Sequence, residues 1–398
     1  MSSASYQLKI AIVGGGPVSL TLANILQKNA ISFTVFEAAD EIRTWGGSLD
    51  IHAGSGQLAL KEAGLWDAFV KKSRPESDCY KIVDLDGKVL WDENLVNKGE
   101  QTEVEKFAGR PEIDRRLLID ILFDSLKSEN IKFGKKLDHI NPPSSKDGTF
   151  NLHFADGTQE SNYNLVIGGD GAWSRVRKLL TDTKPQYSGI FMVEVNCHDI
   201  ASNPWLIDFV GAGSIVSFGE GRVIMAQRQS DGSLRTYAAL RVPEDFIKTC
   251  GIDWSDRDTA REQLVERYFS DIGDDLKRVI LECKDALIPR PLYELPVGFV
   301  WPHRSGATLI GDAAHLMTPW AGVGVNVGMT DALVLGKELV AVSKGEKRLD
   351  DAVKTYEQEM FPRAKGFMEE TENGKNNNFS AAGSKNMADL MRGHHQPT

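Results

Sequence analysis

The segment Gly14-Gly15-Gly16-Pro17-Val18-Ser19 lies between an apolar run and a helical pattern. Glycines there let the backbone turn sharply and approach a pyrophosphate, while the following helix offers free N–H groups and the positive end of its dipole. Glu37 follows about twenty residues later, where an acid accepts hydrogen bonds from an unphosphorylated ribose, as in FAD or NAD. Ser19 replaces the usual third glycine and is small enough for close packing. We predict a dinucleotide site at Gly14, Gly16 and Glu37; a glycine-rich turn without a ligand is the alternative.

A second segment, Gly168-Gly169-Asp170-Gly171-Ala172-Trp173-Ser174-Arg175, also follows an apolar run. The Asp170-Gly171 pair turns the chain tightly, and Ser174 is suited to cap a following helix. We predict that Asp170 contributes to the cofactor site. An ordinary strand–turn–helix junction without a ligand is the alternative interpretation.

A third segment, Gly311-Asp312-Ala313-Ala314-His315-Leu316-Met317-Thr318-Pro319, precedes Ala321-Gly322-Val323-Gly324, which opens a long helix. A carboxylate at a strand end, here Asp312, can bind ribityl hydroxyls. The helix N-terminus at Gly322 and Gly324 can stabilise negative charge on a reduced flavin ring. His315 invites a general-base role, but its place inside a turn favours a structural one.

The elements that must position these segments alternate between strands and helices. Leu8–Val13 predicts a buried parallel strand, Pro17–Asn29 a helix and Ser32–Glu37 a second strand, an order typical of a right-handed crossover. Short β-prone runs between Tyr187 and Val242 predict an inserted antiparallel sheet. We therefore expect an α/β fold: a Rossmann-like FAD-binding domain, an inserted antiparallel β-sheet domain for the substrate, and a C-terminal helix.

The expected domain boundaries follow from these changes in the pattern of strand-prone and helix-prone segments. The FAD-binding domain is expected to be discontinuous, and the Asn- and Gly-rich stretch 373–378 predicts a break before a weakly structured tail. The expected division is 1–74, 105–185 and 302–345 for FAD binding, 75–104 and 186–301 for the substrate domain, 346–372 for the C-terminal helix and 373–398 for the tail.

Composition narrows the classes of partner and compartment. The 398 residues carry a net charge of -10, which argues against nucleic acid and anionic membranes as partners. Four cysteines lie far apart without a CxxC pair, so we expect reduced thiols, no dithiol redox motif and no metal site. The N-terminus lacks a signal-peptide core and no apolar run is long enough to span a bilayer, so a cytoplasmic location is expected. We also expect a monomer.

The three glycine-rich segments together resemble the fingerprints of the class A flavoprotein monooxygenases over roughly residues 8–370. Two further segments, Arg43-Thr44-Trp45-Gly46-Gly47-Ser48-Leu49-Asp50-Ile51-His52 and Arg110-Pro111-Glu112-Ile113-Asp114-Arg115, resemble the tetracycline-inactivating members. The resemblance implies that Arg43 helps to hold NADPH and that Asp50, Arg115 and Asp312 hold FAD. The residue types agree, since Arg43 suits a phosphate.

The resemblance also implies a reaction. NADPH reduces FAD, O2 then gives a flavin C4a-hydroperoxide, and one oxygen atom passes to an aromatic or polyketide-like small molecule, with a tetracycline as one candidate. Since the cofactor supplies this chemistry, we nominate no side chain as an acid–base catalyst. The substrate is expected between the flavin and the inserted sheet, beside Pro319, Glu194 and Met225.

Positions that contact the drug in the tetracycline enzymes correspond here to Glu194, Ser214 and Arg235 or Thr236, and Val323 replaces a family glutamine. For four sheet residues, one of them Met225, a place in the sheet core is favoured over direct substrate lining: Phe191, Met192, Met225 and Tyr237.

Two other functions are considered. A flavin-dependent halogenase would need a buried lysine and a tryptophan-rich motif, and no convincing stretch of that kind is present. A flavoprotein that binds or sequesters a ligand without oxygenating it stays open, because the motifs place FAD but do not show turnover.

Overall fold

The computed structural model describes residues 8–42, 46–96, 99, 101–143, 148–200 and 202–394. Arg43, predicted to hold NADPH, lies outside the described residues.

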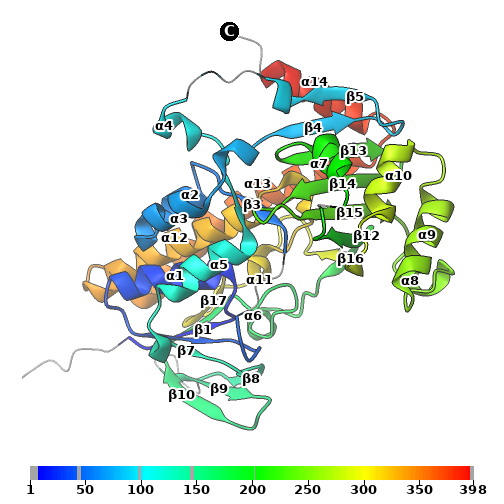
Figure 1. Ribbon diagram of the computed structural model, residues 1–398. Coiled ribbons are helices and arrows are strands. Elements are labelled where there is room, and N and C mark those ends of the chain that lie inside the picture. The colour runs from blue at the N-terminus through cyan, green and yellow to red at the C-terminus, as the bar shows by residue number, and fades with distance from the viewer. Residues whose placement is uncertain are drawn as a thin grey trace, which may run out of the picture.

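A five-stranded parallel sheet forms the lower left part of Figure 1. Its strand order is β17-β11-β1-β2-β7, with β17 at Ala307–Leu309, β11 at Leu165–Gly168, β1 at Ile10–Val13, β2 at Phe33–Phe36 and β7 at Ile131–Lys132. Each neighbouring pair is parallel. β1, β11 and β17 are buried throughout, as expected for strands covered on both faces. The expected Rossmann-like arrangement is confirmed.

Adjacency of β1, β11 and β17 has a direct consequence for the glycine-rich segments. Each segment begins within two residues of the carboxyl end of one of these three strands. Because parallel strands end at the same edge of a sheet, the three segments meet there.

Helices cover this sheet and the edge beside it. Three helices pack side by side: α12 (Gly324–Ser343) lies between α1 (Pro17–Lys28) and α13 (Leu349–Asn378). The remaining helices of this part are α2 (Gly56–Ala63), α3 (Trp66–Lys72), α4 (Glu103–Lys106), α5 (Arg115–Asp124), α6 (Arg177–Leu180) and α11 (Asp312–His315). Short 3-10 turns, η1 to η4, lie at Pro75–Ser77, Glu93–Leu95, Ser128–Asn130 and Pro319–Ala321.

A seven-stranded sheet occupies the upper right part of Figure 1. Its order is β16-β12-β15-β14-β13-β4-β5, with β16 at Leu287–Glu294, β12 at Gln186–Cys197, β15 at Leu234–Arg241, β14 at Arg222–Arg228, β13 at Ser214–Gly219, β4 at Tyr80–Val83 and β5 at Val89–Asp92. All pairs are antiparallel except β13 with β4, which is parallel. The expected inserted sheet is thus confirmed, with one parallel pair that the sequence did not reveal.

The two faces of this sheet have different neighbours because side chains alternate along each strand. Phe191, Val193 and Ile224 belong to a core completed by helical segments at the right of Figure 1. These segments are α7 (Pro204–Val210), α8 (Phe246–Thr249), α9 (Arg257–Tyr268) and α10 (Asp274–Leu281). The opposite face carries Met192 and Met225 and is available to a ligand.

Two smaller sheets complete the fold. β3 (Ser48–Asp50) pairs with β6 (Glu112–Asp114), and β8 (Leu137–Asn141), β9 (Phe150–Phe154) and β10 (Gln159–Tyr163) form an antiparallel three-stranded sheet.

The expected weakly structured tail is wrong. α13 continues through the Asn- and Gly-rich stretch to Asn378, and α14 spans Gly383–His394. Tertiary contacts override the weak local signal: Lys375 is buried and its Nζ lies 2.8 Å from Glu294 Oε1, while Ser384 Oγ donates to Val83 O of β4. α14 therefore packs on the edge strands of the large sheet. The division into domains stays a prediction.

Candidate active site

One cavity of about 460 Å³ lies where the glycine-rich segments face the seven-stranded sheet. From the parallel-sheet side it is lined by Gly16, Pro17, Val18, Ser19, Gly47, Ser48, Leu49, Asp50, Arg115, Gly169, Gly171, Ile310, Gly311, Asp312, Met317, Thr318, Pro319, Gly322, Gly324 and Val325. From the large sheet it is lined by Tyr80, Met192, Ser214, Met225, Gln227 and Tyr237. All three predicted segments thus contribute to a single cavity.

The first two segments touch through their glycines. Gly14 has φ 101°, and a Cβ there would overlap the carbonyl oxygen of Gly169. Ser19, at the place of the usual third glycine, is buried, and a Cβ on Gly169 would overlap its Oγ. The glycine at position 169 therefore makes room for the serine, which explains why the departure at Ser19 does not disturb the fold.

Two predicted carboxylates bind backbone N–H groups. Glu37, at the end of β2, accepts hydrogen bonds from Gly15 N at 2.7 Å and Ala39 N at 2.8 Å, so it holds the glycine-rich turn. Asp170 accepts from Ser174 Oγ at 2.5 Å and Arg175 N at 2.6 Å, and burial raises its pKa. Neither residue lines the cavity. Direct contacts of Glu37 and Asp170 with a cofactor stay predictions.

Arg115 and Asp312 present charge to the cavity. Among the described residues, no hydrogen bond or ion pair engages the Arg115 guanidinium; burial lowers its pKa, and the nearby Asp312 opposes that effect. Burial likewise raises the pKa of Asp312, although its carboxylate faces the cavity. A cation without a described partner and a carboxylate aimed into one cavity are suited to a polar, anionic ligand.

Asp331 of α12 is fully buried and holds the turn that carries Asp312 through hydrogen bonds. Asp331 Oδ2 accepts from Gly311 N at 2.8 Å and lies 2.6 Å from His315 Nε2, while its Oδ1 accepts from Arg363 Nη1 at 3.1 Å. Burial by itself would lower the pKa of His315, but Asp331 raises it above its ordinary value. His315 is 2% exposed and does not line the cavity, in agreement with the structural role favoured from the sequence.

Asp50 lies beside the start of α12. Its carboxylate is 3.0 Å from His52 Nε2, and its carbonyl accepts from Asn326 Nδ2 at 2.8 Å. Gly322 adopts φ 69° at the turn before α12, and a Cβ there would lie 3.9 Å from Asp50 Oδ2. Asp50, Gly322 and Gly324 therefore meet in the cavity, as predicted from segments far apart in the chain.

Substrate-side predictions have mixed outcomes. Pro319 lines the cavity, and so do Met192, Met225 and Tyr237, for which the sequence favoured a core position. Phe191 points to the opposite face and packs in the core, because neighbouring residues of a strand alternate.

Glu194 does not line the cavity. It is buried, accepts from Arg235 Nη1 at 2.6 Å and lies 3.3 Å from Arg290 Nη2. Direct contact of Glu194 with a substrate stays a prediction. In the structure its carboxylate forms ion pairs with Arg235 and Arg290.

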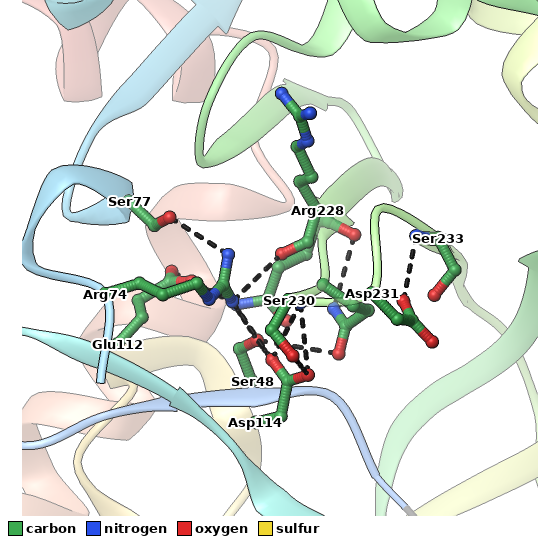
Figure 2. A network of polar contacts seen from close by, with 11 residues as sticks. Ser48, Arg74, Ser77, Glu112, Asp114, Arg228, Ser230, Asp231 and Ser233 are labelled. Atoms are coloured by element: carbon green, nitrogen blue, oxygen red, sulfur yellow. Dashed lines mark hydrogen bonds and ion pairs between the residues drawn. The ribbon is translucent and has the colours of Figure 1, made fainter. Parts of the chain in front are cut away.

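A polar network ties the flavin side of the cavity to the end of β14 (Figure 2). Arg74 points its guanidinium between Ser48 Oγ, at 2.9 Å, and Asp114 Oδ1, at 3.0 Å, and its Nη2 lies 3.5 Å from Glu112 Oε2. Ser230, which follows β14, donates through its backbone N–H to Asp114. β3 and β6 are thereby fastened to the large sheet beside the cavity.

Sequence reasoning missed Tyr80 and Gln227. Both lie on the cavity side of their strands. The alternation in Arg222–Arg228, which places Met225 and Gln227 on one face, was the available signal; Tyr80 carried none, because β4 joins the sheet through a parallel pairing between distant segments.

The described residues fit FAD. A Cβ added at Gly16 or Gly324 would meet nothing within 4 Å, so open space faces the backbone where the first and third segments enter helices. Two helix N-termini, Arg115 and the carboxylates of Asp50 and Asp312 face this cavity, which suits a ligand with phosphate and hydroxyl groups. No group of three or more metal-ligating side chains occurs within the described residues, and no described helix is both long and apolar enough to cross a membrane.

Comparison with known proteins agrees with this geometry. The model of the FAD binding domain family matches residues 7–371. The monooxygenase asqM of Emericella nidulans is 33% identical, with 91% of this chain and 94% of that protein covered. The monooxygenase penA of Penicillium thymicola is 30% identical, with 97% and 98% covered.

Solved structures share the fold. HpxO of Klebsiella pneumoniae, complexed with FAD and uric acid, aligns with a TM-score of 0.75 and 21% identity, covering 95% of this chain and 91% of that one. The tetracycline destructase Tet(51) aligns with a TM-score of 0.68 and 19% identity, covering 97% and 94%. The resemblance to class A flavoprotein monooxygenases is confirmed, and the likeness to a tetracycline destructase is one of fold. The chain belongs to the FAD binding domain family and is an FAD-dependent monooxygenase.

Proposed function

We propose that this enzyme uses NADPH and O2 to hydroxylate an aromatic or polyketide-like small molecule, bound between the flavin and the seven-stranded sheet. The observation that carries the proposal is the single cavity that joins all three nucleotide-binding segments to the face of that sheet. When bound, FAD supplies hydride acceptance and oxygen activation. A tetracycline remains one candidate substrate.

The roles proposed for the chain's residues follow their positions. Asp312 and Asp50 would accept hydrogen bonds from the cofactor's hydroxyl and N–H groups, and Arg115 would offset its phosphate charge. Gly322 and Gly324 would allow the backbone at the N-terminus of α12 to approach a flat ring, and the positive end of the helix dipole would stabilise negative charge there. The sheet residues and Pro319 would cover the substrate and exclude water.

NADPH is proposed as a transient reductant, with Arg43 as one of its contacts. Arg43→Ala should raise the NADPH concentration needed for half-maximal flavin reduction, measured by stopped-flow absorbance, while bound FAD stays unchanged. Arg116→Ala is a matched control, because Arg116 is exposed on α5 and pairs only loosely with Asp120, at 3.9 Å. Unchanged reduction kinetics in Arg43→Ala would remove that residue from the site.

A panel of tetracyclines and phenolic polyketides with mass detection tests the function. A substrate should accelerate the consumption of NADPH and O2 and give a product heavier by one oxygen atom, labelled when 18O2 is used. Binding without such a product throughout the panel would instead favour the alternative, a flavoprotein that sequesters its ligand. A product without label from 18O2 would contradict the proposed source of oxygen.

A further inference from the structure

We infer that the substrate is an uncharged ring compound whose N–H or O–H group is bound by the side-chain oxygen of Gln227. This inference rests on the proposed function, because it takes the cavity as the substrate site. It assigns a specificity-determining role to Gln227, supported by Ser214 and Tyr80.

The large sheet places a row of polar side chains across one end of the cavity. Strand register pairs Arg235 with Gln227, Gln227 with Ser214, and Ser214 with Tyr80. The last three line the cavity. Cross-strand neighbours in such a row lie close enough to act on the same part of a ligand.

Gln227 makes one side-chain hydrogen bond among the described residues. Its Nε2 donates to Glu112 Oε1 at 3.3 Å, so its Oε1 is left as an acceptor, and no described residue donates to that atom. Oε1 and the hydroxyl of Tyr237 both converge on Gly47, where an added Cβ would lie 2.8 and 2.6 Å from them. Glu112 is buried and fastened by Arg74 in the network of Figure 2. The cavity therefore presents a carbonyl oxygen to a donor on the substrate.

The hydroxyl groups near Gln227 are neutral at physiological pH. Burial raises the pKa of Tyr237 to about 12, and burial also raises the pKa of Tyr80. Protonated hydroxyls can donate to a carbonyl on the same substrate edge that donates to Gln227.

The described lining contains no cation for an anionic substrate on the sheet side. Its charged members are Asp50, Arg115 and Asp312, which come from the flavin-binding segments. Beside the lining, on the same face of the sheet, Arg235 and Arg290 are both engaged by Glu194, and Arg290 is about half exposed to solvent. Burying a carboxylate against this surface would be costly, because Arg235 and Arg290 do not line the cavity and already pair with Glu194.

The neighbouring part of the cavity is apolar. Met192, Met225 and Met317 line it, and thioether side chains suit the faces and edges of aromatic rings. A ligand with one polar edge and an apolar ring body matches this division of the surface.

Equilibrium binding to the FAD-loaded enzyme at pH 7 tests the inference without requiring turnover. Two probe pairs are titrated and followed by the change in flavin absorbance: 2-naphthol against 2-methoxynaphthalene, and salicylamide against salicylate. We expect 2-naphthol to bind about tenfold more tightly than its ether, because the ether leaves Gln227 Oε1 unpaired. Salicylamide should bind more tightly than the ionised salicylate.

Gln227→Met keeps the side-chain volume and should abolish the preference for 2-naphthol over its ether. Gln229→Met is the matched control, because Gln229 is buried directly after β14 but does not line the cavity, and it should retain the preference. If Gln227→Met does not load FAD, the two probe pairs on the wild-type enzyme still decide the substrate's chemistry, and Gln227→Glu, which adds a charge but keeps an acceptor, tests the position.

Four outcomes would overturn the inference: equal binding of the naphthol and its ether, tighter binding of salicylate than of salicylamide, a preference that survives Gln227→Met, or no binding by either donor probe. Donor-selective binding without any oxygenated product in the wider panel would support the inference while contradicting the proposed function.

Discussion

Replacement of Asp331 by alanine should show how much this buried carboxylate contributes to the stability of the turn that carries Asp312. The carboxylate is fully buried and serves Gly311 N, His315 and Arg363. Removing one partner of a buried charged network costs about 3–5 kcal/mol, a large share of the roughly 5–15 kcal/mol that holds a typical domain folded. Arg363 keeps its 2.9 Å bond with Glu359, so the loss falls mainly on the Gly311 N–H and His315, and we expect about 3 kcal/mol.

The size of this loss should depend on pH. Asp331 raises the pKa of His315 above its ordinary value, so the stability contributed by the pair is fully present below about pH 6.5 and is lost as the pH rises through the raised value. Asp331→Ala should therefore cost more at pH 6 than at pH 9. It should also weaken FAD retention, since Gly311 and Asp312 form the turn that Asp331 fixes.

Urea unfolding of the apoprotein and the FAD-loaded enzyme measures both effects, with the shift in midpoint converted at constant slope. Asp331→Asn should cost less, because an amide oxygen still accepts from Gly311 N. Glu369→Ala, which removes a surface pair with Lys365 at 3.6 Å, serves as the control and should change little. A midpoint for Asp331→Ala equal to that of the control, at both pH values, would refute the reasoning.

Two further substitutions probe buried carboxyl groups, one lining the cavity and one beside it. Asp312→Ala should weaken FAD binding by about 10- to 100-fold, because a hydrogen bond from a ligand to a charged group contributes about 1.5–3 kcal/mol. Titration of the apoprotein with FAD measures this change. A variant that is yellow and normally loaded with FAD would contradict the proposed role of Asp312. Burial, opposed by Arg74, raises the pKa of Glu112 to about 8, so its contribution to stability is present at low pH and is lost as the pH rises through that value. As the pH rises from 5 to 8, the free energy of unfolding of Glu112→Gln should therefore increase relative to that of the wild type, by up to about 4 kcal/mol at 1.36 kcal/mol per pH unit. Urea unfolding measures this at each pH. A difference between variant and wild type that does not change with pH would contradict the prediction.

Local sequence patterns were sufficient to predict which segments form the cofactor side of the cavity. A strand that ends in glycine and leads into a helix is a local unit, so the segments at Gly14, Gly169 and Gly311 could be recognised one at a time. Their order along the chain was enough to place Asp312, Gly322 and Gly324 in the site. The substrate half was harder, because one face of a sheet is defined only when strands from distant segments pair.

The C-terminal tail shows where the sequence misled, and Glu194 has ionic partners that the sequence did not reveal. Glu194 stands on the cavity face of β12, but Arg235 and Arg290 reach it from neighbouring strands and turn it into a structural ion pair. The tail carried weak helical signals, and only its packing on β4, β5 and β13 explains why it is ordered as α14.

The sequence by itself determined the Rossmann-like arrangement, the three nucleotide-binding segments and the family, because each is written in contiguous residues whose spacing reflects backbone geometry. Tertiary structure alone decided which sheet residues line the cavity, including Tyr80 and Gln227, and which charged side chains beside it are paired. The physical reason is that pairing register and burial set both the direction and the effective charge of a side chain, and neither can be read from its neighbours in the chain.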